Sequence, residues 1–138
     1  MKLYAWVDNG LLFMTEDKNL VLTNAIEFEV ESFDDLIWDG TQIRLKTQDE
    51  KLQELKSQKL SELKTYVADL LAQTDYVITK IAEARVQNDN AEVKALKQKY
   101  ATQLQQRKAI RQWNEQMKQA IRNAQTLEEL RSIEIGYG

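Results

Sequence analysis

The spacing of apolar and polar residues changes once along the chain, near residue 47. Before that point, short apolar runs alternate with turn-forming residues, and residues 26–31 alternate strictly, as in a strand with one buried face. After it, apolar residues recur at steps of three and four, the period of an amphipathic helix. Neither glycine nor proline occurs between residues 41 and 135. The pattern predicts an α+β protein with a small antiparallel β domain over residues 1–46 and a helical domain over residues 47–135.

The predicted β domain opens with a hairpin. Asn9-Gly10 separates two apolar runs, and both residues tolerate the positive φ angles of a type I′ turn. Ser32 can cap a helical turn over residues 33–37, and a last strand is predicted at residues 42–46. Alternation over residues 26–31 places Ile26 on the buried face with Phe28 and Val30. The expected core is Trp6, Phe13, Leu22, Phe28, Val30, Phe33, Leu36, Trp38 and Ile43. A domain this small is near the lower limit for folding alone, so we expect support from the helical domain or another subunit.

The helical domain divides at capping residues. Thr47 with Glu50, and Thr126 with Glu129, form capping-box patterns that start helices. An interruption is expected near Thr74, and a turn at residues 88–90 with Asn90 as the next N-cap. The expected helices cover about residues 48–73, 75–87, 91–124 and 127–134, and the last three residues are expected to fray.

The long third helix carries an imperfect heptad seam. Three of its ten seam positions are polar, namely Gln103, Arg107 and Asn114. Such a seam suits a hairpin packed on the first helix, or an oligomer with polar layers that set register. Folding back within one chain and pairing across subunits both stay open at this point.

Composition removes several functional classes. The chain has no cysteine and no histidine, so thiolate nucleophiles, disulfides, zinc–thiolate sites and the usual near-neutral acid–base group are absent. Its apolar runs are too short to span a membrane, and its N-terminus does not resemble a signal peptide. Glu27, Glu29 and Glu31 could line a cation site, but a solubilising strand face explains them better. We expect no enzyme, no catalytic residues, no metal and no cofactor.

Charge is distributed unevenly along the chain. Residues 1–46 carry a net charge of −5, whereas residues 94–122 carry eight basic side chains against Glu115 alone. Four of these basic residues fall on roughly one stripe of the expected helix, with an aromatic residue close by. The candidate interaction surface is Arg107, Arg111, Trp113, Lys118 and Arg122. This surface could bind phosphates, but a solvated face that meets an acidic partner is the favoured interpretation.

Several segments resemble the proteins of bacteriophage tails. Residues 59–64 and 69–76, which end in Thr74-Asp75-Tyr76, are similar to a charged helix followed by Leu-Leu and Thr-Asp-aromatic near the C-termini of tail-fibre and tail-fibre-assembly proteins. Residues 32–46 resemble the turn and strand that precede this helix in that group. Residues 106–113 and 126–130 resemble its arginine-bearing and closing helices. The resemblance covers about 100 residues with short motifs, and the proline-containing loop of the group is missing here.

The resemblance implies a non-enzymatic tail-associated structural or assembly protein that acts by protein–protein interaction. The expected partners are other phage tail proteins, of the fibre or baseplate, and further copies of the chain. The expected location is the virion tail, or the host cytoplasm during assembly. A nucleic-acid-binding module that uses the basic helix 94–122 is the alternative, and an enzyme that uses carboxylates in a deep cleft is a third class.

Overall fold

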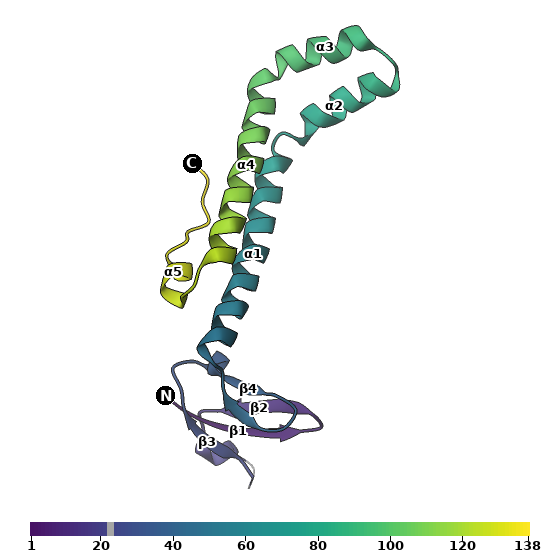
Figure 1. Ribbon diagram of the computed structural model, residues 1–138. Coiled ribbons are helices and arrows are strands. Elements are labelled where there is room, and N and C mark those ends of the chain that lie inside the picture. Colours follow the sequence, from purple (N-terminus) through teal and green to yellow (C-terminus); the bar gives the residue numbers. More distant parts are fainter. Residues whose placement is uncertain (22–23) are drawn as a thin grey trace. The chain divides into compact units, whose positions relative to one another are not determined.

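The computed structural model describes residues 1–21 and 24–138. The chain forms two compact units, Met1–Lys51 and Leu52–Gly138. The described strands all lie in the first unit and are antiparallel, and the helices α2 to α5 lie in the second (Figure 1). The predicted α+β class, with a small β unit before a helical one, is confirmed.

The first unit contains a three-stranded sheet. Its strands are β1 (Lys2–Asp8), β2 (Leu11–Thr15) and β3 (Ile26–Glu29), in the order β2-β1-β3. The predicted hairpin is present and joins β1 to β2, with Trp6 paired with Phe13. Its turn residues, Asn9 and Gly10, have φ angles of 52° and 77°. These angles are those of a type I′ turn, whose twist matches that of the flanking strands.

A second, two-stranded sheet consists of β4 (Leu36–Trp38) and β5 (Ile43–Leu45). Two short 3-10 turns, η1 (Lys18–Leu20) and η2 (Phe33–Asp35), connect the strands of the unit. Ser32 caps η2 as predicted, but the helical turn ends at Asp35 instead of continuing to Ile37. Residues 36–38 are extended because their backbone pairs with β5, and this pairing satisfies more backbone groups than continuing the helical turn to Ile37 would.

The core of the first unit lies on one face of the three-stranded sheet. Its buried residues are Leu3, Ala5, Val30 and Leu36, and Leu12, Met14, Phe28 and Ile43 pack against them. The expected core was therefore right for Phe28, Val30, Leu36 and Ile43. Leu3 and Ala5 were missed, Trp38 is half-buried, and Leu22 lies outside the described residues.

Several apolar side chains expected in this core lie elsewhere. Trp6 and Phe13 project from the opposite face of the sheet, because successive residues of a strand alternate and Leu3 and Ala5 occupy the buried face. Phe13 is 42% exposed, and Phe33 and Ile26 are also exposed. Both faces of the β1–β2 hairpin are apolar in sequence, so alternation alone could not select the buried one.

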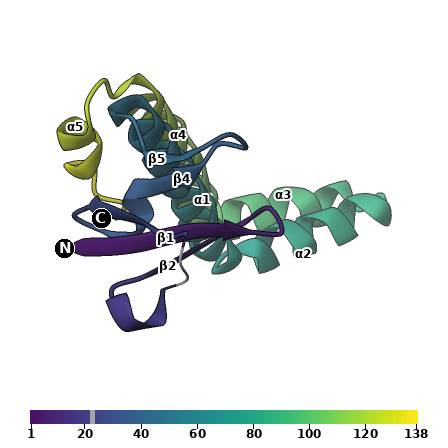
Figure 2. The ribbon, with the colours of Figure 1, turned by 90° about the horizontal axis from the view of Figure 1, so that it is seen from below.

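Five helices follow the strands. They are α1 (Gln48–Ala72), α2 (Asp75–Val86), α3 (Asn90–Lys99), α4 (Ala101–Asn123) and α5 (Leu127–Arg131). In the second unit, α4 folds back along α1, and α3 lies beside α2 (Figures 1 and 2). Fold-back therefore occurs within one chain, the first of the two arrangements that the heptad seam allowed.

Two apolar clusters hold the helical unit together. The first joins α1, α4 and α5 through the buried side chains Leu63, Val67, Ile110, Ile121 and Leu130. The second joins α2 to α3 through Val77, Ile81, Ala84, Leu96 and Tyr100. Most seam positions of the long predicted helix thus face a neighbouring helix of the same chain.

The helix expected over residues 91–124 is divided at Tyr100. This residue ends α3 and precedes α4, with φ −105° and ψ 24°. Its ring is buried and meets the ring of Tyr76 edge-on at 5.7 Å. The division lets α3 pair with α2 while α4 pairs with α1, so tertiary packing overrides a sequence without any helix breaker.

The turn between α2 and α3 is closed by a Schellman motif. Asn88 has a φ of 55°, its N–H donates to the Arg85 carbonyl, and the N–H of Asp89 donates to the Ala84 carbonyl. The N-cap of α3 is Asp89, whose carboxylate accepts from the N–H of Glu92 at 3.0 Å, and not Asn90 as expected. The turn position itself was predicted correctly.

The chain end is anchored rather than frayed. The N–H of Tyr137 donates to the hydroxyl of Tyr66 at 2.9 Å, and the ring of Tyr137 lies 5.3 Å from that of Trp113. Aromatic packing and one hydrogen bond thus fix a segment whose glycines suggested disorder.

Candidate interaction surfaces

The five candidate residues on α4 separate into buried and exposed groups. Arg107 is only 6% exposed, and Trp113 and Lys118 are intermediate. Arg111 and Arg122 are exposed. Sharing a helical stripe therefore did not give these residues a common environment, because the stripe runs along the boundary between the covered and the open side of α4.

Arg107 belongs to the interior of the helical unit. Its Nη1 donates to the Leu71 carbonyl at 2.7 Å, to Thr74 Oγ1 at 2.9 Å and to Asp75 Oδ1 at 2.9 Å. These acceptors lie at the corner between α1 and α2, where the Leu71 carbonyl also accepts from the N–H and the hydroxyl of Thr74, and where the start of α2 has no side-chain N-cap bond. Arg107 Nε is buried without a partner among the described residues. The expected role of Arg107 in an open basic surface is therefore wrong, because its side chain is buried and its Nη1 donates to the groups of this corner.

Trp113 is enclosed by aromatic side chains from distant positions. Its ring lies 5.8 Å from that of Tyr66 on α1 and 5.3 Å from that of Tyr137 in the C-terminal segment. The hydrogen bond between Tyr137 and Tyr66 completes this cluster. Trp113 thus packs against the C-terminal segment through Tyr137. The residues around Trp113 in the sequence do not indicate this contact.

Lys118 and Arg122 lie toward the C-terminal end of α4, and Arg111 lies near its middle. Lys118 Nζ is 3.3 Å from Glu115 Oε1, an exposed pair one helical turn apart. The backbone carbonyl of Arg122 accepts from Lys56 Nζ at 2.8 Å, which neutralises the negative end of the α4 dipole. Of the original five, Arg111 and Arg122 present side chains fully available to a partner.

A lysine–tyrosine group lies at the α2–α3 pair and was not singled out from the sequence. Lys80 Nζ is 3.1 Å from the Tyr100 hydroxyl and lies over the rings of Tyr76 and Tyr100, and Lys99 also lies over Tyr100. The hydrogen bond from Lys80 lowers the pKa of Tyr100 against the effect of burial, and the same bond raises the pKa of Lys80. The spacing of four residues between Tyr76 and Lys80 could have predicted their contact on one side of a helix. The contact of Lys80 with Tyr100, 20 residues away, depends on the tertiary structure and could not be predicted from that spacing.

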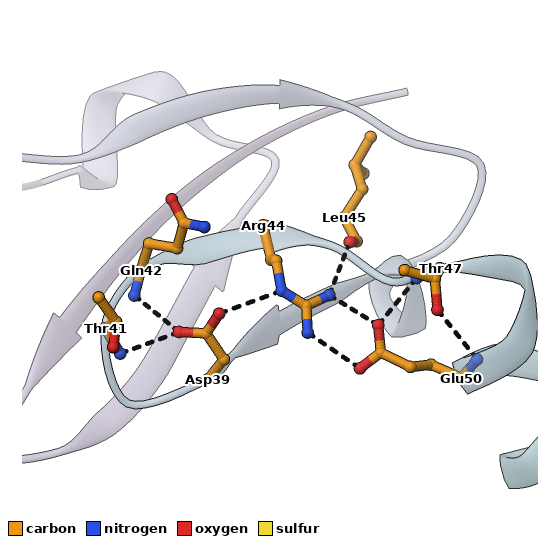
Figure 3. A network of polar contacts seen from close by, with 7 residues as sticks. All are labelled: Asp39, Thr41, Gln42, Arg44, Leu45, Thr47 and Glu50. Carbon is orange, nitrogen blue, oxygen red and sulfur yellow. Dashed lines mark hydrogen bonds and ion pairs between the residues drawn. The ribbon is translucent and has the colours of Figure 1, made fainter.

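Arg44 is the centre of a polar network in the first unit (Figure 3). Its Nε donates to Asp39 Oδ2 at 3.1 Å, and its Nη1 and Nη2 reach the two carboxylate oxygens of Glu50 at 2.6 and 3.1 Å. Glu50 also accepts from the N–H of Thr47, whose hydroxyl accepts from the N–H of Glu50. The predicted capping box at the start of α1 is thus confirmed and is locked to the β4–β5 turn.

This network shifts the pKa values of its members. The hydrogen bond from Arg44 is the main cause that lowers the pKa of Glu50 to about 2. Backbone N–H groups of Gln42 and Thr41 lower the pKa of Asp39. Burial raises the pKa of Asp35, but the N–H groups of Glu31 and Ser32 and the Lys51 ammonium outweigh it, so the net shift is downward. Asp35, Asp39 and Glu50 therefore favour their charged forms.

The glutamates of β3 are engaged in ion pairs. Glu27 pairs with Lys2 at 3.3 Å, and Glu29 pairs with the N-terminal amine at 3.0 Å. Glu31 is exposed. Among the described residues, no group of three or more acidic side chains is placed to hold a metal ion. Within the same residues, no helix is long and apolar enough to cross a membrane.

Both units expose apolar side chains on open faces. In the first unit, the stacked rings of Trp6 and Phe13, 5.9 Å apart, lie on the sheet face opposite the core, and Leu11 beside them is 62% exposed. In the second unit, Ile78 and Val86 on α2 are 42% and 82% exposed. Contiguous apolar surface of this kind commonly marks a contact with another protein. The exposed apolar surface of the first unit could have been expected from the sequence, because both faces of the β1–β2 hairpin carry apolar residues and only one can face the core.

No protein-family model matches the chain, and neither curated proteins nor solved structures match it.

Proposed function

We propose that the chain is a non-enzymatic, tail-associated structural or assembly protein of a tailed bacteriophage that acts by binding other proteins. The first unit docks a tail-fibre or baseplate protein, and the helical unit associates with a partner or with further copies. The site of action is the virion tail, or the host cytoplasm during assembly.

One observation carries the link to tail proteins. The Thr74-Asp75-Tyr76 segment and the arginine-bearing segment 106–113 each resemble tail proteins, and they lie about 30 residues apart in the sequence. In the structure these segments meet, because Arg107 donates to both Thr74 and Asp75. The two segments that resemble tail proteins therefore belong to one structural feature, the α1–α2 corner bound by Arg107. This supports treating the two segments as one motif.

The surface chemistry supports a binding role over a catalytic one. Exposed apolar groups on both units can supply affinity, and the negative first unit and the basic α4 can orient a partner. A raised pKa favours general acid catalysis by a carboxyl group near neutral pH, whereas the pKa values of Asp35, Asp39 and Glu50 are lowered.

The proposal is tested by co-expressing the chain with the tail-fibre and baseplate proteins encoded beside it. We expect a complex of defined mass, or a fibre protein that becomes soluble only with the chain present. Phe13→Asp should weaken that complex about tenfold or more, since it places a charge on an apolar contact. Glu16→Asp, an exposed position of the same unit, is the control. A chain that binds none of these proteins, or genes of metabolism in place of tail genes at its locus, would refute the proposal.

A nucleic-acid-binding role is the second candidate, favoured by the excess of cations in residues 94–122. Arg107 and the Glu115-paired Lys118 weaken it, since neither side chain is fully free. Retention on DNA at low salt that disappears in the Arg111→Ala/Arg122→Ala variant would support this role. No retention at low salt would exclude it.

A further inference from the structure

Helix α2 carries a row of apolar side chains on the side turned away from its own core. Val77, Ile81 and Ala84 are the residues that α2 buries in the core it shares with α3. Ile78 and Val86 are instead exposed, with Ala82 midway between them. We call Ile78, Ala82 and Val86 the α2 row. Steps of four residues place its members one above the other along one side of the helix.

Two shallow hollows lie on either side of the α2 row. The first, of about 400 Å³, is lined by Ile78, Thr79, Ala82, Glu83, Val86 and Gln87. The second, of about 410 Å³, is lined by Ile78, Ile81, Ala82, Arg85, Lys97 and Leu104. Both surfaces are mainly apolar, and Ala82, the smallest side chain of the row, borders both. A small residue between two larger ones allows another helix to approach closely, and the hollows can receive its side chains.

The two hollows carry opposite charges. Glu83 lies at the first, and Arg85 and Lys97 lie at the second. Among the described residues, none of these three side chains takes part in an ion pair. The α2 row is thus an apolar seam with an unpaired acidic side and an unpaired basic side.

We propose that the α2 row binds the α2 row of a second copy of this chain, with the two helices parallel and related by a two-fold axis that runs along them. Such an axis exchanges the two sides, so that Glu83 of each copy faces Arg85 and Lys97 of the other. A two-fold axis across the helices would make them antiparallel and set Glu83 against Glu83. The order of charges therefore makes the α2 row complementary to a second copy of itself in the parallel arrangement and not in the antiparallel one. This inference rests on the proposed function, in which the helical unit self-associates, and gives that association a surface.

The first test measures molar mass by sedimentation from micromolar to millimolar concentration. We expect the chain to form dimers, and Val86→Asp or Ile78→Asp to weaken dimerisation about tenfold or more, because each would bury an unpaired charge. Leu20→Asp is the matched control, since Leu20 is 67% exposed in the first unit and lies outside the row. Far-ultraviolet circular dichroism should be the same for all variants, since each replaced side chain is exposed. A strictly monomeric chain, or a dimer that Val86→Asp leaves intact, overturns the proposal.

The second test uses charge exchange to determine the arrangement. In the parallel dimer, Glu83→Lys sets a lysine of each copy against Arg85 of the other, and Arg85→Glu sets a glutamate of each copy against Glu83 of the other. Each variant alone should therefore associate several-fold more weakly than the original chain. An equal mixture of the two variants should recover association, because the introduced lysine then meets the introduced glutamate and the original Arg85 meets the original Glu83. Single variants that associate as well as the original chain contradict the parallel arrangement.

These outcomes are separable from a failure of the proposed function. A Val86→Asp chain that is monomeric yet still binds its tail-protein partner confirms the dimer surface and the docking role independently. If the original chain dimerises through the α2 row but binds none of the neighbouring tail proteins, the inference holds and the proposed function fails.

Discussion

At the scale of single residues, Arg107 shows how burial changes the meaning of a charge. In the sequence it is one cation in a basic stretch, whereas in the structure its guanidinium binds three acceptors at the α1–α2 corner. Two of these acceptors, Thr74 and Asp75, belong to the segment that interrupts the helical pattern. The interruption in the helical pattern therefore has a physical partner, the Nη1 group of Arg107.

Replacement of Arg107 should destabilise the helical unit. We expect Arg107→Ala to lower the free energy of unfolding by about 2–4 kcal/mol, because it removes the side chain that donates to the Leu71 carbonyl, Thr74 Oγ1 and Asp75 Oδ1, and opens a cavity. Arg107→Lys should recover part of this loss. Chemical denaturation measures the effect, and Arg111→Ala is the control because Arg111 is exposed on the same helix. Equal effects of the two alanine variants would contradict a structural role for Arg107.

Glu50 should make the first unit sensitive to acid. Its pKa is lowered from 4.5 to about 2, so the stabilisation from its ion pair with Arg44 is complete above pH 4.5 and is lost as the pH falls toward 2. Glu50→Gln should reduce the stability at neutral pH and make its decline over this range shallower. Thermal unfolding of both proteins between pH 7 and about pH 2 tests this.

Glu16→Gln is the matched control for that measurement, since Glu16 is exposed and forms no hydrogen bond or ion pair among the described residues. An unchanged acid dependence in Glu50→Gln would show that Asp35 and Asp39, whose pKa values are also lowered, determine it instead.

At the scale of elements, capping residues predicted the boundaries better than apolar periodicity did. The capping box at Thr47 starts α1, and Ser32 starts η2. The Thr126 hydroxyl caps α5 by accepting from the N–H of Glu129, but the predicted capping box is incomplete because the Glu129 carboxylate accepts from the N–H of Gln125 instead of that of Thr126. These motifs succeed because both of their partners lie within four residues of each other. The division at Tyr100 was missed because its cause is the packing of Tyr100 against Tyr76 and Lys80, from another helix.

The α2–α3 turn depends on a left-handed residue. Asn88 has a φ of 55°, and a β-branched side chain there should cost about 1–2 kcal/mol. We therefore expect Asn88→Val to lower the free energy of unfolding by this amount, and Asn88→Gly to keep it within about 0.5 kcal/mol of the original. Gln87→Val, one residue earlier with a φ of −82°, is the control. Denaturation curves for the three variants give the comparison, and a tolerated Asn88→Val would contradict the role of the turn.

At the scale of the whole molecule, the chain forms two units that have separate cores. The first unit is built around Leu3, Ala5, Val30 and Leu36, and the second around clusters on α1 to α5. Both expose apolar side chains that their own cores do not use. Exposed apolar side chains on both units favour binding to other proteins, which would cover these side chains, and this is the role we propose.

The sequence by itself determined the properties that depend on neighbours within a few residues. The Asn9-Gly10 hairpin, the capping boxes, the turn at Asn88 and the α+β order all follow from local backbone preferences, which act before any tertiary contact forms. Absence of cysteine and histidine likewise limited the chemistry without reference to the fold.

Only the tertiary structure decided which face of each element is covered. It buried Leu3 instead of Trp6, placed Arg107 inside a corner and enclosed Trp113 between Tyr66 and Tyr137. It also left the α2 row open, although Ile78 and Val86 match the buried residues of α2 in hydrophobicity. Burial depends on contacts between residues 20 to 71 positions apart, as in Lys80 with Tyr100 and Tyr66 with Tyr137, and periodicity within one segment carries no information about them.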